Sequence, residues 1–509
     1  MPYKSKTFDE EPVTRSRRAL PWDGRGGVDE WPQKSRGAAA SPLERFDEEA
    51  SSSAPDSSKE EARTSVKRWP ELKRGHALSF AGILLFTAIT YFRPYELIPA
   101  LSSLTSMAFW AAVATLLVFV PVQLSLEGTP TARPREVNLV LLLLLTGLLS
   151  VPFAIEPGEA WPAFIDFTKV VTMFIVMVNV VRSEMRLRAM FWLALIVAIV
   201  LSVSALIDYG TGNLALEGIR IKGLISSLFD NPNDMALYLV TMIPLSLGLM
   251  FVARGLSKKI VYALCALLLV GAVVVTFSRG GFLGLACAMF VMSWKLGRRN
   301  RTGVLLLFLA AIAVFFALVP HDYIVRLLTI FGGSDWQGGS ASARENLLLR
   351  SLQVMLRHPL FGIGMNNFHN VSAHEQVSHN AYTQVGGEMG VAALVLYVMF
   401  LWSAFKRMSA IERETYEERR ETRVYYLAVA LEAALVGYMV SSFFASVAYL
   451  WYIYYLVGYA LCLDRLYDAK GASGIFSRVR VGRRLSDTEE SNNPVSFQEP
   501  LAANGRKPL

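Results

Sequence analysis

The stretch KIVYALCALLLVGAVVVTF, residues 259–277, decides the fold class of this chain. After its first residue, Lys259, it contains no further charge and few polar side chains. About 20 apolar residues in an α-helix are enough to cross a hydrocarbon core about 30 Å thick. We therefore expect residues 259–277 to form a transmembrane helix.

Further apolar runs of similar length lie on both sides of this stretch. Together they give predicted spans at 77–94, 104–124, 137–155, 162–181, 187–207, 233–253, 259–277, 280–296, 302–320, 381–403, 424–442 and 444–463. Helices satisfy their own backbone hydrogen bonds in lipid, which irregular segments do not. We expect an all-α fold: a polytopic membrane helix bundle of about twelve transmembrane helices, with a large helical loop on the extracytoplasmic side.

The two ends of the chain differ from its middle in composition. Residues 1–75 are rich in Ser, Glu, Arg, Ala and Pro without a sustained apolar period, and residues 466–509 are similar. Such segments bury too little apolar surface to fold alone. We expect two disordered cytoplasmic tails around a transmembrane domain at 76–465, in which residues 321–380 form a large outer loop. The three cysteines lie inside apolar runs, so no disulfide framework is expected.

Lysine and arginine gather in alternate connections between the predicted spans. With a cytoplasmic N-terminus, the basic connections are the cytoplasmic ones, as the positive-inside rule requires. They hold Arg133 and Arg135; Arg182, Arg186 and Arg188; Arg254, Lys258 and Lys259; Lys295, Arg298, Arg299 and Arg301; and Lys406, Arg407, Arg419, Arg420 and Arg423. The pattern predicts that both termini are cytoplasmic. Since topology explains the net charge of +8, we expect no nucleic-acid partner.

Three connections assigned to the outside contain basic residues against this trend. They are the loop with Arg220 and Lys222, the tight turn at Arg279, and the long loop 321–380. Binding of an anionic ligand is the expected reason. The alternatives are a solvated loop charge at Arg220 and a snorkelling interfacial cation at Arg279.

The long outer loop contains a predicted helix. Ser342-Ala343-Arg344-Glu345 fits a capping box at its start, and Pro359 ends it. Leu348, Leu352 and Met355 fall on one face, which predicts an amphipathic helix along the outer membrane surface. The alternative is that this helix only covers the bundle. Five of the six histidines lie between His321 and His379, but their spacing resembles no metal motif, so we expect no metal and no cofactor.

His379-Asn380 lies where the long loop enters the tenth predicted span. Asn380 is expected to cap that helix, which leaves His379 at the water-facing rim. Gly386 and Gly390 follow at positions that fall beneath His379 on a helix. Small residues there allow close approach of a substrate chain or, alternatively, of a neighbouring helix in a plain packing seam.

Several motifs together resemble a known family. His379-Asn380 is followed after nine residues by Gly390, and HPLFGIGMNNF at 358–368 precedes it. FDNPNDMA at 229–236 and TFSRGG at 276–281 lie upstream in the same order. These stretches resemble motifs of the bacterial O-antigen ligase and O-antigen polymerase superfamily, which includes O-oligosaccharyltransferases, over about 210–400.

The resemblance implies a metal-independent glycosyltransferase of the bacterial cytoplasmic (inner) membrane, acting in cell-envelope polysaccharide and lipopolysaccharide biosynthesis. Its donor would be a glycan on polyprenyl pyrophosphate, and its acceptor a lipid, glycan or protein hydroxyl at the outer face. By position, His379 resembles the family histidine that acts on the acceptor hydroxyl. Arg220 and Arg279 are the candidate catalytic groups for the leaving pyrophosphate, since guanidinium groups bind phosphate with forked hydrogen bonds.

Further residues are candidates for substrate binding: Arg344, Asn380, Asn231 and Asn233. For Asn231 and Asn233 the alternative is that they hold the turn and cap the sixth span. Two other functions stay open. One is a polymerase of the same superfamily. The other is a polysaccharide or lipid transporter, although we find no internal repeat of the kind that transporters show.

Overall fold

The structure is a computed structural model of the chain. It describes residues 75–98, 101–213, 221, 229, 231–318, 323–324, 340–372, 376–417, 419 and 423–472. These residues form helices and turns without a β-strand, which confirms the predicted all-helical fold. The predicted N-terminal tail up to residue 74 and the C-terminal tail from residue 473 lie outside the described residues.

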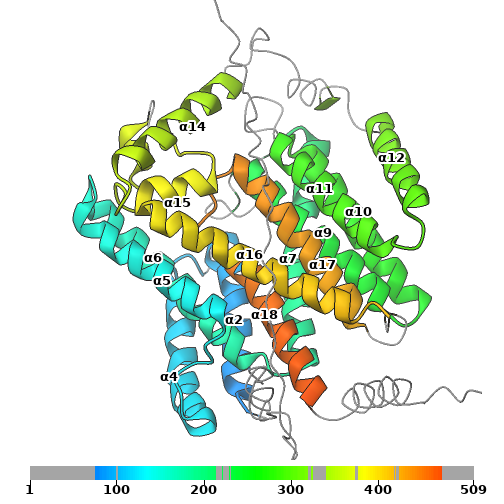
Figure 1. Cartoon of the computed structure of the whole chain (residues 1–509), viewed down its shortest axis with the longest axis horizontal. Helices are drawn as coiled ribbons and strands as arrows, with labels where there is room; N and C mark the ends of the chain where they lie inside the picture. The colour runs from blue at the N-terminus through cyan, green and yellow to red at the C-terminus, as the bar shows by residue number, and fades with distance from the viewer. Residues whose placement is uncertain are drawn as a thin grey trace, which may run out of the picture. The chain divides into compact units, whose positions relative to one another are not determined.

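Figure 1 shows how the helices are arranged. Their bounds are α2 Ala77–Phe92, α3 Pro94–Leu97, α4 Met107–Glu127, α5 Arg135–Ser150, η2 Val151–Phe153, α6 Pro157–Val180, α7 Glu184–Thr211, α9 Pro232–Val252, α10 Leu256–Val275, α11 Arg279–Leu296, α12 Arg301–Leu318, α14 Ser340–Arg357, η3 Phe368–Val371, α15 Ala381–Met389, α16 Val391–Glu414, α17 Val424–Ser441, η5 Ser442–Phe444 and α18 Trp451–Ala472.

Nine helical segments among the described residues are long and apolar enough to cross a membrane. They comprise α2 with α3, α4, α5 with η2, α6, α7, α9, α10, α16, and α17 with η5. The other three predicted spans also contain helices, α11, α12 and α18, but these fall outside the nine. Charged residues lower the apolarity of two of them, with Arg279 and Lys295 in α11 and Asp464 in α18. The protein is a multi-pass membrane protein, and nine of its twelve predicted spans contain such a segment among the described residues.

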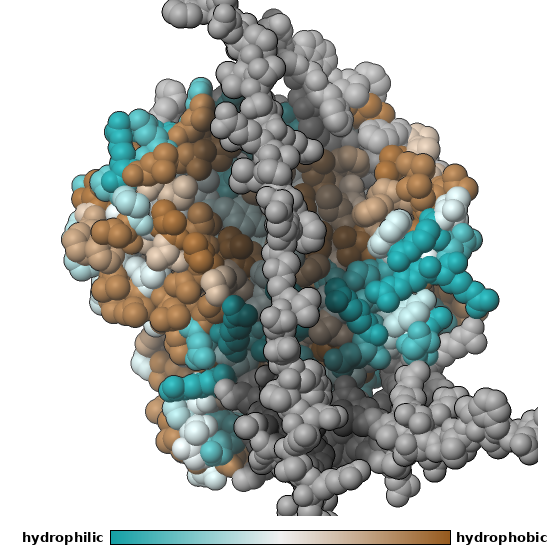
Figure 2. Space-filling view, viewed as in Figure 1, coloured by the Kyte–Doolittle hydropathy of each residue, from teal (hydrophilic) through white to brown (hydrophobic). Residues whose placement is uncertain are grey.

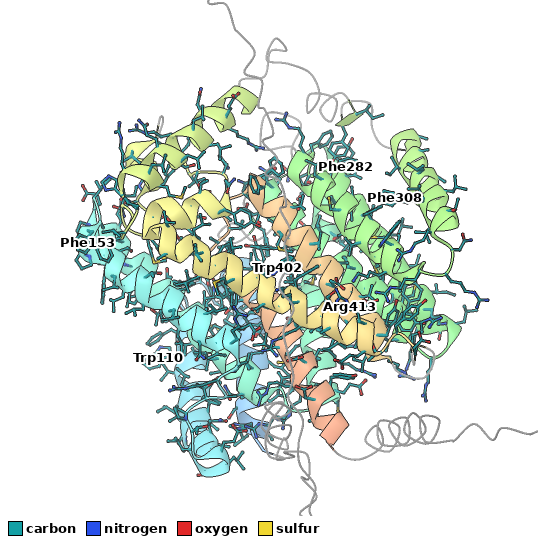
Figure 3. All side chains as sticks on the ribbon, viewed as in Figure 1. Trp110, Phe153, Phe282, Phe308, Trp402 and Arg413 are labelled. Carbon is teal, nitrogen blue, oxygen red and sulfur yellow. The ribbon has the colours of Figure 1, made fainter. Side chains whose placement is uncertain are left out.

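Large apolar side chains are exposed on the surface of the helical unit. Figure 2 shows hydrophobic residues over much of the visible face. Trp110 of α4 is 64% exposed and Phe153 of η2 is 57% exposed, and Figure 3 shows both at the periphery of the helices. In water such large exposed side chains would be unfavourable. In a bilayer they contact hydrocarbon.

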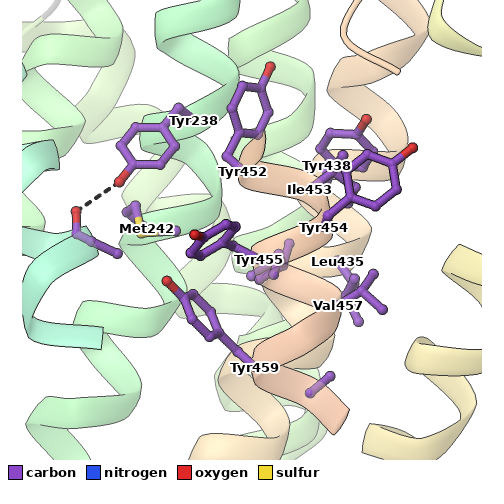
Figure 4. Close-up of a cluster of buried hydrophobic side chains, with 14 of the residues drawn as sticks. Tyr238, Met242, Leu435, Tyr438, Tyr452, Ile453, Tyr454, Tyr455, Val457 and Tyr459 are labelled. Atoms are coloured by element: carbon purple, nitrogen blue, oxygen red, sulfur yellow. Dashed lines mark hydrogen bonds between the residues drawn. The ribbon is translucent and has the colours of Figure 1, made fainter. Parts of the chain in front are cut away.

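Tyrosines tie α18 to its neighbours in the core (Figure 4). Tyr238 of α9 donates to the Ala194 carbonyl at 2.8 Å, and Tyr455 of α18 lies 2.9 Å from the Thr87 hydroxyl of α2. A buried hydroxyl costs free energy unless it finds a hydrogen-bond partner. These bonds therefore join α9 to α7 and α18 to α2.

One end of the helices collects buried ion pairs. Lys295 of α11 lies 3.3 Å from Glu412 of α16 and 3.0 Å from Glu432 of α17. Arg298 lies 2.8 Å from Glu412. Because Arg279 begins α11 and Lys295 stands near its end, these pairs lie at the opposite end of α11 from Arg279. The basic connections after α11 and α16 thus share one end, as the charge pattern requires, while the orientation in the membrane stays a prediction.

Three predicted boundaries are wrong. The tenth span is not continuous, because Gly390 adopts φ +92° and separates α15 from α16. The last span does not begin at 444: α18 begins at Trp451 and continues past residue 465 to Ala472. The loop helix α14 begins at Ser340, so Ser342 lies in its first turn and not at the cap. Its end at Arg357, before Pro359, agrees with the prediction.

Candidate functional site

A cavity of 330 Å³ lies where α11 begins, at the end away from the ion pairs. It is lined by residues from four separate parts of the chain: Arg279 and Leu283 of α11; Arg344, Glu345 and Leu348 of α14; Ser378, His379 and Asn380 before α15; and Phe443 and Phe444 of η5. The lining therefore combines two guanidinium groups and an imidazole with the aromatic side chains of Phe443 and Phe444, here called the apolar wall.

The turn before α11 positions Arg279. Phe277 adopts φ +53°, and Ser278 then caps α11 by accepting a hydrogen bond from the Gly281 amide at 3.1 Å. Gly280 packs against Phe444, where even one added methyl group would lie 2.7 Å from the Phe444 Cβ. Arg279 is thus the first residue of a capped helix that stands close to the apolar wall of the cavity.

Asn231 and Asn233 hold the neighbouring helix start. Asn231 Oδ1 accepts from the Asn233 amide at 2.9 Å and caps α9. Asn233 Oδ1 in turn accepts from the Ser278 hydroxyl at 2.9 Å. These bonds couple the start of α9 to the start of α11. Both side chains therefore hold the turn, and neither is among the described residues that line the cavity. Their role in substrate binding stays a prediction.

The backbone conformation of His379 and the helix cap that follows it fix its position. It adopts φ +51°, a left-handed conformation that is unusual for a side chain other than glycine. Asn380 follows as the predicted cap of α15, and its Oδ1 accepts from the amides of Tyr382 at 2.9 Å and Thr383 at 3.1 Å. His379 therefore has strained backbone between the buried Ser378 and the cap residue Asn380, and these neighbours hold it where it lines the cavity.

Electrostatics keep this imidazole neutral. Burial, with a smaller contribution from the positive charge of Arg344, lowers the pKa of His379 to about 4 from an ordinary 6.5. Near neutral pH the ring therefore carries no charge and has one nitrogen that can accept a proton. The other histidine of the loop with a described partner, His369, lies 3.2 Å from Glu159 and does not line the cavity.

The motif at 358–368 supports α15 and does not line the cavity. Gly362 and Gly364 have φ +68° and φ +96°, and the amides of Ile363 and Gly364 donate to the carbonyls of Gly387 and Glu388, each at 3.0 Å. Both glycines need left-handed backbone, which other residues adopt at a cost. This turn therefore fastens the C-terminal end of α15.

The two glycines beneath His379 serve packing. Gly386 faces Met355 of α14, so it lets the two helices approach closely. Gly390 ends α15, with the carbonyls of Pro359 and Leu360 where a side chain would stand. Leu347, Ser351 and Val354 are the buried face of α14, one position away from the predicted stripe of Leu348, Leu352 and Met355. Gly386 therefore forms the predicted packing seam, whereas Gly390 interrupts the helix between α15 and α16.

The cavity brings together four predicted site residues: Arg279, Arg344, His379 and Asn380. Arg220 lies outside the described residues. The sequence did not single out Ser378, Glu345, Phe443 or Phe444 for the site, although all four line the cavity. The two phenylalanines directly follow Ser441-Ser442, and a break in the apolar run at that polar pair was the available signal.

Comparison with known proteins gives a match to a family model. A search of curated proteins finds no match to this chain. The family model described as O-antigen ligase matches residues 264–398. That segment contains Arg279, Arg344 and His379, which come from α11, α14 and the turn before α15 and meet in one cavity. Over residues 264–398, this multi-pass membrane protein is therefore similar to the O-antigen ligase family.

Proposed function

We propose that the protein moves a glycan from polyprenyl pyrophosphate to an acceptor hydroxyl at the outer face of the cytoplasmic membrane. The observation that carries the proposal is the meeting of Arg279, Arg344 and a neutral His379 in one cavity at one end of the helices. The family match supports a lipid-linked glycan as the substrate. The transfer needs two things, a site for the leaving pyrophosphate and a base for the hydroxyl.

The arginine side of the cavity suits the leaving group. When the bond between the sugar C1 and the phosphate oxygen breaks, the electron pair stays on polyprenyl pyrophosphate. Guanidinium groups stabilise that charge with paired hydrogen bonds. The start of α11 adds the partial positive charge of a helix N-terminus at Arg279, which favours a bound anion. Arg220, from a loop outside the described residues, is proposed as a further pyrophosphate ligand.

The histidine side suits the acceptor. The acceptor oxygen forms the new bond to C1, and its proton passes to a ring nitrogen of His379. A general base must be neutral and within reach of the reacting hydroxyl. The lowered pKa of His379 keeps the ring neutral, and its place beside Arg344 keeps it on the same cavity as the leaving group. No step in this scheme calls for a metal ion.

The experiment that tests this function is glycan transfer by purified protein in liposomes. The donor is a polyprenyl-pyrophosphate glycan, and three acceptors are offered separately: a lipid-core saccharide, a second donor molecule and a serine-containing peptide. Transfer to one of them supports the proposal, and that acceptor tells ligase from polymerase or protein glycosylation. Movement of intact donor across the bilayer without transfer would instead establish a transporter.

We expect a characteristic pH dependence of transfer. Since His379 must be neutral, the rate should fall as the pH drops through its pKa. In kcat/KM, which reports the free enzyme, the acid limb should lie near the pKa of about 4. In kcat the limb should lie at higher pH, because bound pyrophosphate favours the imidazolium.

Rates measured between acidic and neutral pH check this prediction. His369→Ala is the control, and the acid limbs of its kcat/KM and kcat profiles should stay where they are in the wild type. An acid limb in kcat/KM near the ordinary 6.5 would contradict the buried, arginine-facing environment of His379.

The same lowered pKa means that the unfolded chain binds this proton more readily than the folded protein does. The folded protein should therefore lose stability as the pH falls from about 6.5 towards 4.

A further inference from the structure

The segment 442–450, between α17 and α18, lies along α15. The segment and α15 are joined by hydrogen bonds: Ser442 Oγ to Tyr382 Oη at 3.3 Å, Ser446 Oγ to Ser378 Oγ at 3.1 Å, the Ala448 amide to Gln384 Oε1 at 3.4 Å, and Tyr449 Oη to Glu388 Oε2 at 2.9 Å. Figure 1 shows the end of α17 beside the start of α15. The segment therefore contacts α15 from before its first turn to its last.

The same segment also reaches α11 and the cavity. Phe443 and Phe444 form the apolar wall, and Phe444 packs on Gly280, next to Arg279. Ser441, just before the segment, donates to the Gly280 carbonyl at 3.2 Å. One stretch of chain thus touches the helix that carries Arg279 and the turn that carries His379.

The bond between Ser446 and Ser378 stands next to the strained histidine. Ser378 is 2% exposed and donates its only hydroxyl proton to the Asn380 carbonyl at 3.1 Å. Ser446 must then be the donor in its 3.1 Å contact with Ser378. His379 lies between Ser378 and Asn380, which the Ser378 hydroxyl joins into one turn. The hydroxyl of Ser446 therefore holds the turn that carries the imidazole.

We propose that Ser446 is a positioning residue for His379 in glycan transfer, acting through Ser378. The inference rests on the proposed function. The bond holds a backbone that would otherwise leave its left-handed conformation, because a non-glycine residue at φ +51° is stable only where its surroundings enforce it. Small displacements of a catalytic group lower the rate without removing the substrate site.

The test compares Ser446→Ala with the wild type at equal membrane abundance. We expect kcat to fall about tenfold, as loss of one positioning hydrogen bond allows. The KM for donor should change little, since Arg279 and Arg344 are untouched. Ser446→Thr keeps the hydroxyl at a partly exposed position and should restore the rate. Because water reaches a loosened ring more easily, the acid limb of kcat/KM in Ser446→Ala should move up towards the ordinary 6.5.

The charged groups that share the cavity with His379 stay in place in this variant, namely Arg279, Arg344 and Glu345. A shifted acid limb therefore reports on the environment of the ring itself. Tyr449→Phe is the matched control: it removes the bond of the same segment to Glu388, near the other end of α15. It should lower membrane abundance without changing kcat or the acid limb.

An unchanged kcat in Ser446→Ala would overturn the inference. So would equal losses in Ser446→Ala and Tyr449→Phe, because the segment would then serve the fold alone. If the wild type itself transfers no glycan under the same conditions, the proposed function fails, and this inference fails with it. Transfer by the wild type with a normal Ser446→Ala variant removes only the inference.

Discussion

Replacement of His379 by alanine should lower the rate of glycan transfer by about 10²–10⁴-fold, the usual loss when one general base is removed. Donor binding should stay nearly intact, because the proposed ligands of the pyrophosphate are Arg279 and Arg344 and not the imidazole. The cap of α15 should also survive, since Asn380 provides it and not His379. Transfer rate, donor affinity and membrane abundance, measured on the same preparation, check these three expectations.

His369→Ala is the control for this prediction. His369 belongs to the same outer loop, but it pairs with Glu159 at 3.2 Å and stands outside the cavity wall. Its replacement should cost far less activity. A His379→Ala variant as active as the wild type would end the assignment of the base. Loss of abundance with a normal rate per molecule would show that His379 only joins the loop to α15.

Arg279→Ala should lower transfer by about 10²–10³-fold, the loss expected when one preorganised donor to a developing oxyanion is removed. Unlike His379→Ala, it should also weaken donor binding, because the proposed role of this guanidinium is to contact the pyrophosphate before and after the reaction. Arg279→Lys keeps the charge but not the planar fork, so it should recover only part of the rate. Folding should survive, since Ser278 caps α11 through its own hydroxyl.

Arg301→Ala provides the matched control, because Arg301 is likewise the first residue of a helix in the same domain. Its guanidinium lies 4.0 Å from the centre of the Trp294 ring, near the end of α11 opposite to Arg279. We expect normal transfer in that variant. Normal transfer in Arg279→Ala at equal abundance would remove the leaving-group role and leave Arg279 as an interfacial cation.

Local features of the site could be predicted from the sequence. Asn380 and Asn231 cap helices as expected, because a side-chain oxygen before a helix satisfies free amides wherever the helix stands. The approximate spans followed from runs of apolar residues. The placement of Arg279 and the outer loop on one side of the bundle followed from the alternation of basic residues. The helix caps and the approximate spans depend on residues within one short segment, which is why the sequence alone predicts them.

The arrangement of the cavity could not be predicted in the same way. No local pattern states that η5 packs on Gly280, so Phe444 appeared to begin a span. The segment 445–450 is mostly apolar, but its hydrogen bonds to Ser378 and Gln384 hold it along α15 and outside α18. The break at Gly390 likewise depends on the Pro359 and Leu360 carbonyls packed against it. Each of these features is a contact between distant parts of the chain.

The central claim is that donor enters the cavity from the outer face of the membrane. Cysteine labelling tests it, in a chain whose own Cys265, Cys287 and Cys462 are replaced. Phe443 lines the cavity and is 52% exposed, so Phe443→Cys should react with a membrane-impermeant thiol reagent in intact spheroplasts. Lys258→Cys, in a connection predicted to be cytoplasmic, should react only after permeabilisation.

Added polyprenyl-pyrophosphate glycan should slow the labelling of Phe443→Cys and leave Lys258→Cys unaffected, because only Phe443 lines the cavity proposed to bind the donor. Labelling of Phe443→Cys only after permeabilisation would place the cavity on the wrong side for an outer-face donor. If Phe443→Cys is labelled from the outside but donor does not slow the labelling, the cavity is not the binding site of the donor.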